Sequence, residues 1–309
     1  MGVVNVTEVM DKNFGRCVKM ENGGVELLVT LDFGPRILHY ALVGHENMMY
    51  QDTTRRKLGE EYPVYGGDQC ILYGGHRLWI SPEILPRCYH PDNAPVEYEQ
   101  TSDGVIFTAQ IEEHSQIQKS MMITMSSTDN AVKILHKITN HSLWELEIAP
   151  WAITMMAAGG VAAIPVAGPV TGVLPNRRLA MWDYTNPADT RLTMGKEYAL
   201  IRQSKDAQDA FKIGLFNHSG FGAYFNKGQA FFKHFDVTDG IFTDFGCNFE
   251  VYTNENFLES ESLGALQMLA TGQSVLHTEI WEIFPETTVP QTEAEAAELI
   301  GKYVKDENR

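Results

Sequence analysis

Five short segments between residues 96 and 154 decide the fold: VEYEQT (96–101), VIFTAQI (105–111), IQKSMMITM (117–125), AVKILHKIT (131–139) and LEIAPWAIT (146–154). Turn-forming residues such as Asp103-Gly104 separate the segments. Because strands joined by short turns pair with their neighbours, we predict that all five form one antiparallel meander. Few windows anywhere in the chain show the 3.6-residue period of an amphipathic helix, so the pattern favours an all-β protein.

Similar segments continue on both sides of this meander. VELLVT (25–30) and RILHYAL (36–42) flank Gly34-Pro35, which predicts a hairpin-like pair of strands. Residues 44–70 mix glycines and a proline with charges and predict a long loop, a kind of segment that often carries function. Further strands are predicted at ALIRQ (199–203), FKIGLF (211–216), FGAYF (221–225) and AFFKHFDV (230–237).

Two segments depart from this strand pattern. Residues 157–175 are small and apolar, with three prolines and four glycines, so we predict a packed loop across the sheet face. A domain linker is the alternative, although linkers are usually more polar. Thr292 and Glu295 form a capping box ahead of Leu299 and Ile300, which predicts a C-terminal helix. Together the patterns predict one large β-sandwich domain over residues 1–309.

Composition narrows the classes of partner. The chain has 309 residues, 44% of them hydrophobic and 21% charged, as in folded proteins. The net charge of −16 disfavours nucleic acid, anionic membranes and polyanionic substrates, and no basic run exceeds Arg55-Arg56-Lys57. A neutral ligand such as a sugar is compatible with this charge.

Cysteine usage and the apolar runs indicate a location. The four cysteines are widely spaced and form no C-x-x-C pair, so no structural metal is expected. The N-terminus has no signal-peptide pattern, and no apolar run approaches the roughly 20 residues that span a bilayer. We therefore expect a cytosolic protein with reduced thiols.

The segment YGGHRLWISPE (73–83) has the composition of a binding site. His76 and Arg77 follow two glycines and precede Trp79, in a segment too polar for a core and too aromatic for an ordinary loop. An Arg fork beside a titratable His can hold the hydroxyls or carboxylates of a ligand. The alternative is that His76 is a hydrogen-bonded structural residue.

The segment around residues 257–263 supplies carboxylates. If it is extended, Glu259 and Glu261 project to one face while Leu258 and Ser260 project to the other. Two neighbouring carboxylates repel, and burial raises the pKa of at least one, which produces a base that works near neutral pH. The alternative is a solvated edge strand with protective charges.

Aromatic and charged residues elsewhere can complete a sugar site. Trp79, Trp151 and Trp182 offer apolar rings, on which the C–H face of a pyranose stacks. Arg178 follows the segment rich in glycine and proline, Lys212 begins a strand, and Asp244 opens the second polar segment. Singly, each of the tryptophans is compatible with a core position.

Several motifs together resemble a known family. They are similar to the uncharacterised galactose mutarotase-like proteins, which are relatives of the aldose 1-epimerases. The resemblance implies a β-supersandwich with a shallow carbohydrate cleft across one sheet and no cofactor. It covers roughly residues 25–285 and rests on YGGHRLWISPE (73–83), PNRRLAMWDY (175–184), the strand KIG (212–214), DFGCNFEVYTNENFLESESLG (244–264) and HTE (277–279).

The resemblance also implies catalytic roles. In true mutarotases a Glu takes the proton of the anomeric hydroxyl, and a His protonates the ring oxygen. By position, Glu261 matches the base, with Glu259 as the fallback, and His76 is the counterpart for the acid. The family's mid-chain Asn-His motif is similar in letters to Asn140-His141, but these residues precede the corresponding strand.

We therefore expect a mutarotase or epimerase acting on a free sugar, with Arg77, Trp151, Arg178, Asp244, Lys212 and Glu259 around the ligand. One alternative is a carbohydrate-binding module without catalysis. Another is a lyase or hydrolase that uses Tyr73 or Tyr252. The sequence leaves the sugar, the anomer and the oligomeric state open.

Overall fold

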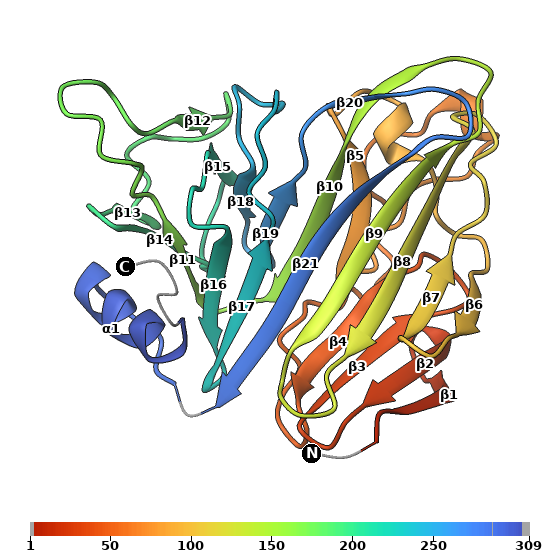
Figure 1. Cartoon of the computed structure of the whole chain (residues 1–309), viewed down its shortest axis with the longest axis horizontal. Helices are drawn as coiled ribbons and strands as arrows, with labels where there is room; N and C mark the ends of the chain where they lie inside the picture. The colour runs from red at the N-terminus through yellow and green to blue at the C-terminus, as the bar shows by residue number, and fades with distance from the viewer. Residues whose placement is uncertain (1–2, 286, 305–309) are drawn as a thin grey trace.

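Two antiparallel sheets pack face to face in the computed structural model, which describes residues 3–285 and 287–304 (Figure 1). Within these residues the larger sheet has eleven strands. Its order is β1 (Asn5–Asp11), β2 (Gly15–Glu21), β3 (Val25–Thr30), β4 (Ile37–Leu42), β5 (His76–Ser81), β10 (Leu146–Ala157), β19 (Phe257–Leu263), β18 (Phe249–Thr253), β15 (Phe211–Leu215) and β12 (Leu179–Met181), with β20 (Gln267–Leu269) paired to β10.

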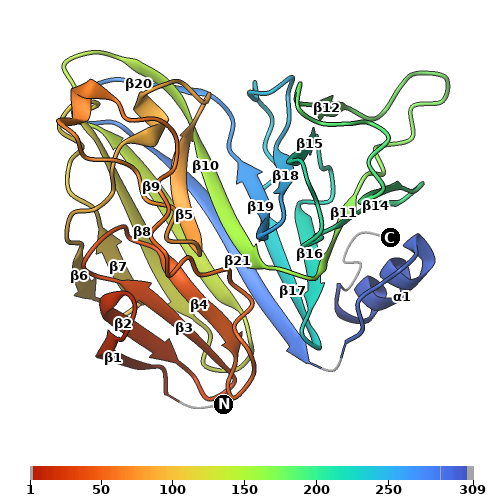
Figure 2. The same ribbon diagram turned by 180° about the vertical axis from the view of Figure 1, so that it is seen from behind.

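The smaller sheet has ten strands in the described residues and faces the viewer in Figure 1. Figure 2 turns the larger sheet toward the viewer. The order of the smaller sheet is β13 (Leu192–Met194), β14 (Tyr198–Arg202), β11 (Val161–Pro165), β16 (Phe221–Asn226), β17 (Gln229–Phe235), β21 (Ser274–Pro285), β9 (Val132–Asn140), β8 (Ile117–Met125), β7 (Val105–Thr108) and β6 (Glu97–Gln100). The all-β sandwich expected from the sequence is confirmed.

The predicted meander is confirmed for four of its five strands. Strands β6 to β9 pair in sequence order within the smaller sheet. The fifth strand, β10, leaves the meander and pairs with β5 and β19 in the larger sheet, so that part of the prediction is wrong. The reason is burial: β9 alternates between buried and partly or fully exposed residues, whereas β10 is buried on both faces from Ile148 onward. A strand without a polar face belongs in the middle of a covered sheet.

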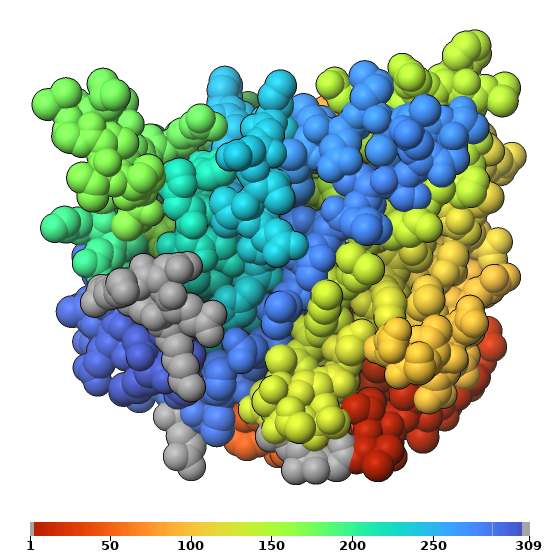
Figure 3. Space-filling view, in the orientation of Figure 1, coloured from red at the N-terminus to blue at the C-terminus, as the bar shows by residue number. Residues whose placement is uncertain are grey.

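The prediction of a loop over residues 157–175 is wrong in its first half. Residues 161–165 form strand β11, which pairs with β14 and β16. Gly160 precedes this strand and Pro165 is its last residue, so the residues that disfavour strands bound it instead of interrupting it. Residues 158–160 form a turn before β11, and the residues after 165 form a loop that projects from the molecule (Figure 3), in which Val170 and Val173 are fully exposed.

The predicted hairpin and C-terminal helix are both confirmed. Strands β3 and β4 pair antiparallel. Helix α1 (Glu293–Tyr303) begins after Thr292, whose hydroxyl accepts from the backbone N–H of Glu295. Its apolar side buries Leu299 and Ile300 against the outside of the smaller sheet. No helix in the described part of the chain is long and apolar enough to cross a membrane. Two single-turn 3₁₀ helices, η1 (Pro63–Tyr65) and η2 (Arg87–Tyr89), lie in the connections on either side of β5.

Candidate functional site

Rows of side chains cross the outer face of the larger sheet, because directly paired residues of antiparallel strands share a face. One row runs from Met155 through Glu259 and Tyr252 to Lys212. The next row runs from Arg77 through Ile153, Glu261 and Glu250 to Gly214. A third row begins with Trp79, Trp151 and Leu263. The rows bring charges and aromatic rings from five strands onto one surface.

Part of this surface, which includes Glu259, Tyr252 and Lys212, forms the floor of a cleft of about 330 Å³. The long connection between β4 and β5 supplies one wall, including Arg56 and Lys57. Tyr184 also lines the cleft, and it follows β12, the strand at one edge of the larger sheet. The cleft is lined by Arg56, Lys57, Leu58, Leu72, Arg77, Trp79, Glu83, Tyr89, Trp151, Ile153, Tyr184, Lys212, Tyr252, Asn254, Phe257 and Glu259.

Two cations, Arg77 and Lys212, line the cleft and form ion pairs with carboxylates of the same sheet face. Arg77 Nη2 lies 3.3 Å from Glu259 Oε1. Lys212 Nζ lies 3.0 Å from Glu261 Oε2, which also accepts a hydrogen bond of 2.7 Å from Trp151 Nε1. Both cations contact aromatic faces, since the Arg77 guanidinium lies over Trp79 and the Lys212 ammonium over Trp151. The contacts orient the charged groups before any ligand binds.

The carboxyl of Glu259 is the group best suited to proton transfer. Burial raises the pKa of Glu259 to about 7, against the attraction of Arg77 and with the repulsion of Glu261. Its side chain lines the cleft. A carboxyl with a pKa near neutral pH can both accept and release a proton under physiological conditions.

The structure brings five of the predicted site residues together: Arg77, Trp151, Lys212, Glu259 and Glu261. The two glutamates share a face, as the strand parity predicts, while Ser260 and Ser262 face the other sheet. The alternative of a solvated edge strand is wrong, because β19 lies between β10 and β18 and is buried along its whole length.

His76 does not share a cavity with Glu261. It is completely buried on the opposite face of β5, where Nδ1 contacts Thr154 Oγ1 and Nε2 lies 2.7 Å from His136 Nε2. Burial lowers the pKa of His76 well below its usual value. The expected pair of His76 as acid with Glu261 as base is therefore not assembled, and the alternative of a hydrogen-bonded structural His describes the geometry.

Arg178 and Asp244 lie outside the cleft. Arg178 is exposed, and its guanidinium lies 5.7 Å from the centre of the Phe216 ring. Asp244 is half-buried in the turn after β17, with a positive φ of 51°. Neither residue lines the cleft in the way that the resemblance implied.

Sequence reasoning missed Glu250, Tyr184 and Asn254. Glu250 and Tyr252 are two residues apart on β18, so strand parity puts both on one face. The missing information was the register with β19, which sets Glu250 opposite Glu261. Tyr184 and Asn254 come from connections, where no periodic pattern indicates direction.

A polar network fills the space between the sheets behind the cleft. The ligand atoms of His76, His136 and Glu279 lie within 4.8 Å of one another, a spacing that suits a metal ion. These atoms are engaged by protein donors and acceptors, however. His136 Nδ1 donates to the carbonyl of His277, and Glu279 accepts from Lys233 Nζ at 2.8 Å and from Trp281 Nε1. The Lys233 ammonium already neutralises Glu279, so we interpret the three residues as part of a hydrogen-bonded network and not as metal ligands.

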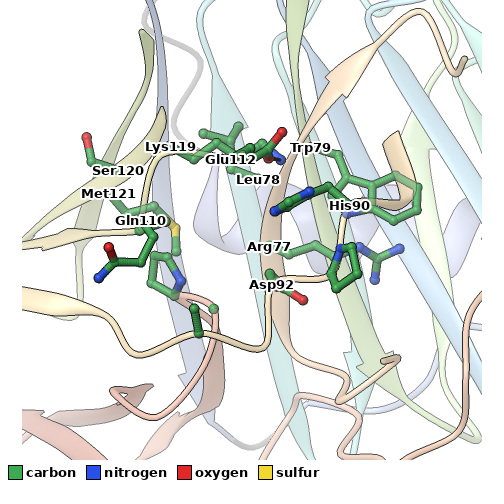
Figure 4. Close-up of a pocket in the computed structure, with 15 residues that line it drawn as sticks. Arg77, Leu78, Trp79, His90, Asp92, Gln110, Glu112, Lys119, Ser120 and Met121 are labelled. Carbon is green, nitrogen blue, oxygen red and sulfur yellow. Dashed lines mark hydrogen bonds and ion pairs between the residues drawn. The ribbon is translucent and has the colours of Figure 1, made fainter. Parts of the chain in front are cut away.

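A smaller hollow of about 50 Å³ adjoins the cleft and shares Arg77 and Trp79 with it (Figure 4). It lies between β5 and the meander, whose side is lined by Lys119, Ser120 and Met121. Its charges are paired within the protein, since Lys119 Nζ lies 2.5 Å from Glu112 and Asp92 binds Arg36. This pairing leaves little charge for a ligand.

The chain has the galactose mutarotase-like fold. It resembles a galactose mutarotase-like protein from Clostridium acetobutylicum with a TM-score of 0.55 at 11% identity, over 91% of this chain and 99% of that one. A similar protein from Lactobacillus casei gives a TM-score of 0.54 at 12% identity, over 87% and 100%.

A TPR-domain containing protein from Parabacteroides distasonis gives a TM-score of 0.59 at 12% identity, over 90% of this chain. The chain spans about half of that protein, 49% of its length. No family model matches the sequence, and no curated protein matches it significantly. At these identities the likeness establishes the fold.

Proposed function

We propose that the cleft binds a free sugar and catalyses the exchange of its α and β anomers, with Glu259 as the general base. The observation that carries the proposal is the position of Glu259. Its carboxyl has a pKa of about 7 and lines a cleft that also contains aromatic rings and paired charges. Such a surface suits a pyranose, which has apolar C–H faces and hydroxyls that need donors and acceptors. The galactose mutarotase-like neighbours support this substrate class.

Glu259 and Lys212 are placed so that a sugar bound between them can lose a proton to one residue and gain a proton from the other. They lie in the same row across the sheet, with Tyr252 between them. Two strand spacings separate their backbones, roughly 10 Å, and both side chains are long enough to reach a ring bound between them. Glu259 would take the proton of the anomeric hydroxyl while the Lys212 ammonium donates to the ring oxygen. The bond between C1 and the ring oxygen breaks, and the open-chain aldehyde rotates about C1–C2. On closure the hydroxyl that was the ring oxygen attacks C1 and returns its proton to Lys212, while Glu259 returns its proton to the former aldehyde oxygen.

We assign the base to Glu259 in preference to Glu261. Glu261 is completely buried and does not line the cleft. One of its oxygens is engaged by both Trp151 and Lys212. We infer that Glu261 holds Lys212 in place and does not contact the sugar.

The test is the rate of anomer exchange in a panel of hexoses and pentoses, followed by NMR. The Glu259→Gln variant keeps the shape of the side chain and removes its basicity, so we expect the rate to fall by about 10²–10⁴-fold. Arg178→Ala is the matched control, because it removes a charge outside the cleft. Equal rates for wild type and Glu259→Gln on every sugar that binds would exclude Glu259 as the base.

A second candidate function is sugar binding without catalysis. It is favoured by the composition of the cleft, since no histidine is found among the described residues that line it. In this case sugars bind with ordinary affinity, and their anomers exchange no faster than in buffer. The same NMR panel separates the two functions.

A further inference from the structure

Glu250 and Glu261 lie directly opposite each other on the adjacent strands β18 and β19. Directly opposed residues have Cβ atoms roughly 4.5–5.5 Å apart, so two ionised carboxylates at these positions repel. Both side chains are completely buried, with 0% of their surface exposed, so water does not screen the repulsion. The state in which both carboxyls are ionised is therefore energetically unfavourable.

A single cation serves both carboxyls. Lys212 Nζ lies 2.7 Å from Glu250 Oε2 and 3.0 Å from Glu261 Oε2. One ammonium neutralises one carboxylate, which leaves a second buried charge without compensation. Lys233, on the other side of the sheet, is already paired with Glu279. The other titratable groups that act on the pair from surrounding elements are Asp244, Cys247, Tyr184, Tyr252 and Glu259.

The hydrogen bonds distinguish the two carboxyls. Glu261 Oε2 accepts from Trp151 Nε1, which stabilises the ionised form of Glu261. Within the described residues Glu250 has only the contact of its Oε2 with Lys212 Nζ, and neither Glu250 Oε1 nor Glu261 Oε1 has a hydrogen-bond partner. A buried carboxylate with fewer donors is the more costly of the two, and protonation removes its charge. Burial, with repulsion from Glu261 and Asp244, raises the pKa of Glu250 well above its usual value despite Lys212.

We propose that Glu250 and Glu261 share one proton and together carry a single negative charge, which holds Lys212 protonated at the floor of the cleft. The proton resides mainly on Glu250, and the charge resides mainly on Glu261 beside Trp151. Glu250 and Glu261 are then positioning residues, and they act on the ligand through Lys212. Only the use of Lys212 by a sugar rests on the proposed function; the shared proton does not.

The first test detects the proton itself by infrared spectroscopy. The background is Glu259→Gln, which removes the other carboxyl that titrates near neutral pH. At pH values above neutral we expect a band from one buried protonated carboxyl. Adding either Glu250→Gln or Glu261→Gln removes it, because the remaining carboxyl then has the Lys212 ammonium as its own counter-charge. A spectrum without the band, or a band that survives both substitutions, overturns the proposal.

The second test follows the ionisation of Lys212 by NMR of labelled lysine side chains, with the signal assigned by its loss in Lys212→Arg. Each single Gln variant keeps one counter-charge and retains a protonated Lys212. The double variant Glu250→Gln/Glu261→Gln lowers the pKa of Lys212 by about 1–3 units. If Glu250→Gln alone lowers this pKa as far as the double variant does, the carboxyls do not share a proton.

The single variants keep the proposal testable if the double variant fails to fold. Neither measurement contains a sugar, so its result is independent of anomer exchange. A shared proton with no effect of Glu259→Gln on exchange would overturn the proposed function alone. Anomer exchange that depends on Glu259, without a protonated carboxyl in the pair, would overturn this inference alone.

Discussion

Lys233 Nζ lies 2.8 Å from Glu279 Oε1 at a point where both side chains are completely buried. The same ammonium donates to the backbone carbonyls of Ala152 and Ser260, on the central strands β10 and β19 of the opposite sheet. The pair thus joins the smaller sheet to the strands that carry the cleft.

Replacing Glu279 with Gln should lower the free energy of unfolding by about 3–5 kcal/mol, because it leaves the Lys233 ammonium buried without a counter-charge. Urea denaturation followed by circular dichroism measures the change. Glu282→Gln on the same strand is the control. The Glu282 carboxylate is partly exposed and pairs with His234, so this variant should change the free energy of unfolding by about 0.5 kcal/mol or less. Similar losses in the two variants would show that the buried charge does not matter.

The rate of anomer exchange should rise with pH and level off above the pKa of Glu259, about 7, because the base acts in its ionised form. The attraction of Arg77 lowers the pKa of Glu259. In Arg77→Met this pKa should therefore rise, and the acidic limb of the profile should move to higher pH. The dependence of kcat/KM on pH measures both effects, and an unmoved limb in a folded Arg77→Met variant would contradict the role of Glu259.

His277 should make the protein less stable as the pH falls. Burial lowers the pKa of His277 to about 3. As the pH falls below about 6.5, His277 therefore becomes protonated in the unfolded chain but stays neutral in the folded chain. This contribution to stability is present above pH 6.5 and is lost as the pH falls toward the folded value. Between pH 6.5 and 5 the loss is about 2 kcal/mol for one histidine.

The measurement compares wild type with His277→Gln by urea denaturation over this pH range. Other groups, including His76, His136 and Glu259, titrate in both proteins, so only the difference in slope reports on His277. Parallel pH profiles would mean that His277 is free to accept a proton in the folded state.

Gly214 leaves room for the carboxyl pair. A Cβ at this position would lie 2.8 Å from Cys247 Sγ and 3.3 Å from Glu250 Cγ. Gly214→Ala should therefore destabilise the protein by about 1–3 kcal/mol through overpacking. Gly301→Ala is the control, because within the described residues no atom beyond the local backbone of helix α1 lies within 4 Å of the added Cβ. There the change should stabilise the protein by roughly 0.5–1 kcal/mol. Thermal unfolding of both variants gives the comparison.

The sequence was sufficient for the fold class and for the face that carries the site. Period-2 patterns and turn residues identified the strands, and parity placed Glu259 and Glu261 together. The prediction of one β-sandwich domain over residues 1–309 stays a prediction. Local patterns did not reveal that β10 changes sheets, because a strand buried on both faces resembles any other apolar segment.

The roles within the site depend on contacts between distant segments. All six residues of β5 are buried, so the strand has no polar alternation to show that His76 and Arg77 face different sides. The partner of His76 is His136, sixty residues away in the other sheet. Glu259 and Glu261 look equivalent in the sequence. They differ only because Lys212 and Trp151 engage one of them and Arg77 the other.

The strict alternation along β19 also limits how this strand can change in evolution or engineering. Insertion of a single residue near its start would exchange its faces. The two glutamates would then enter the sandwich interior near Glu279, and Ser260 and Ser262 would line the cleft. Insertion of two residues keeps every side chain on its own face. Insertions or deletions of an odd number of residues within β19 are therefore not tolerated. The connection before β5 can change in length without moving the residues at the floor of the cleft.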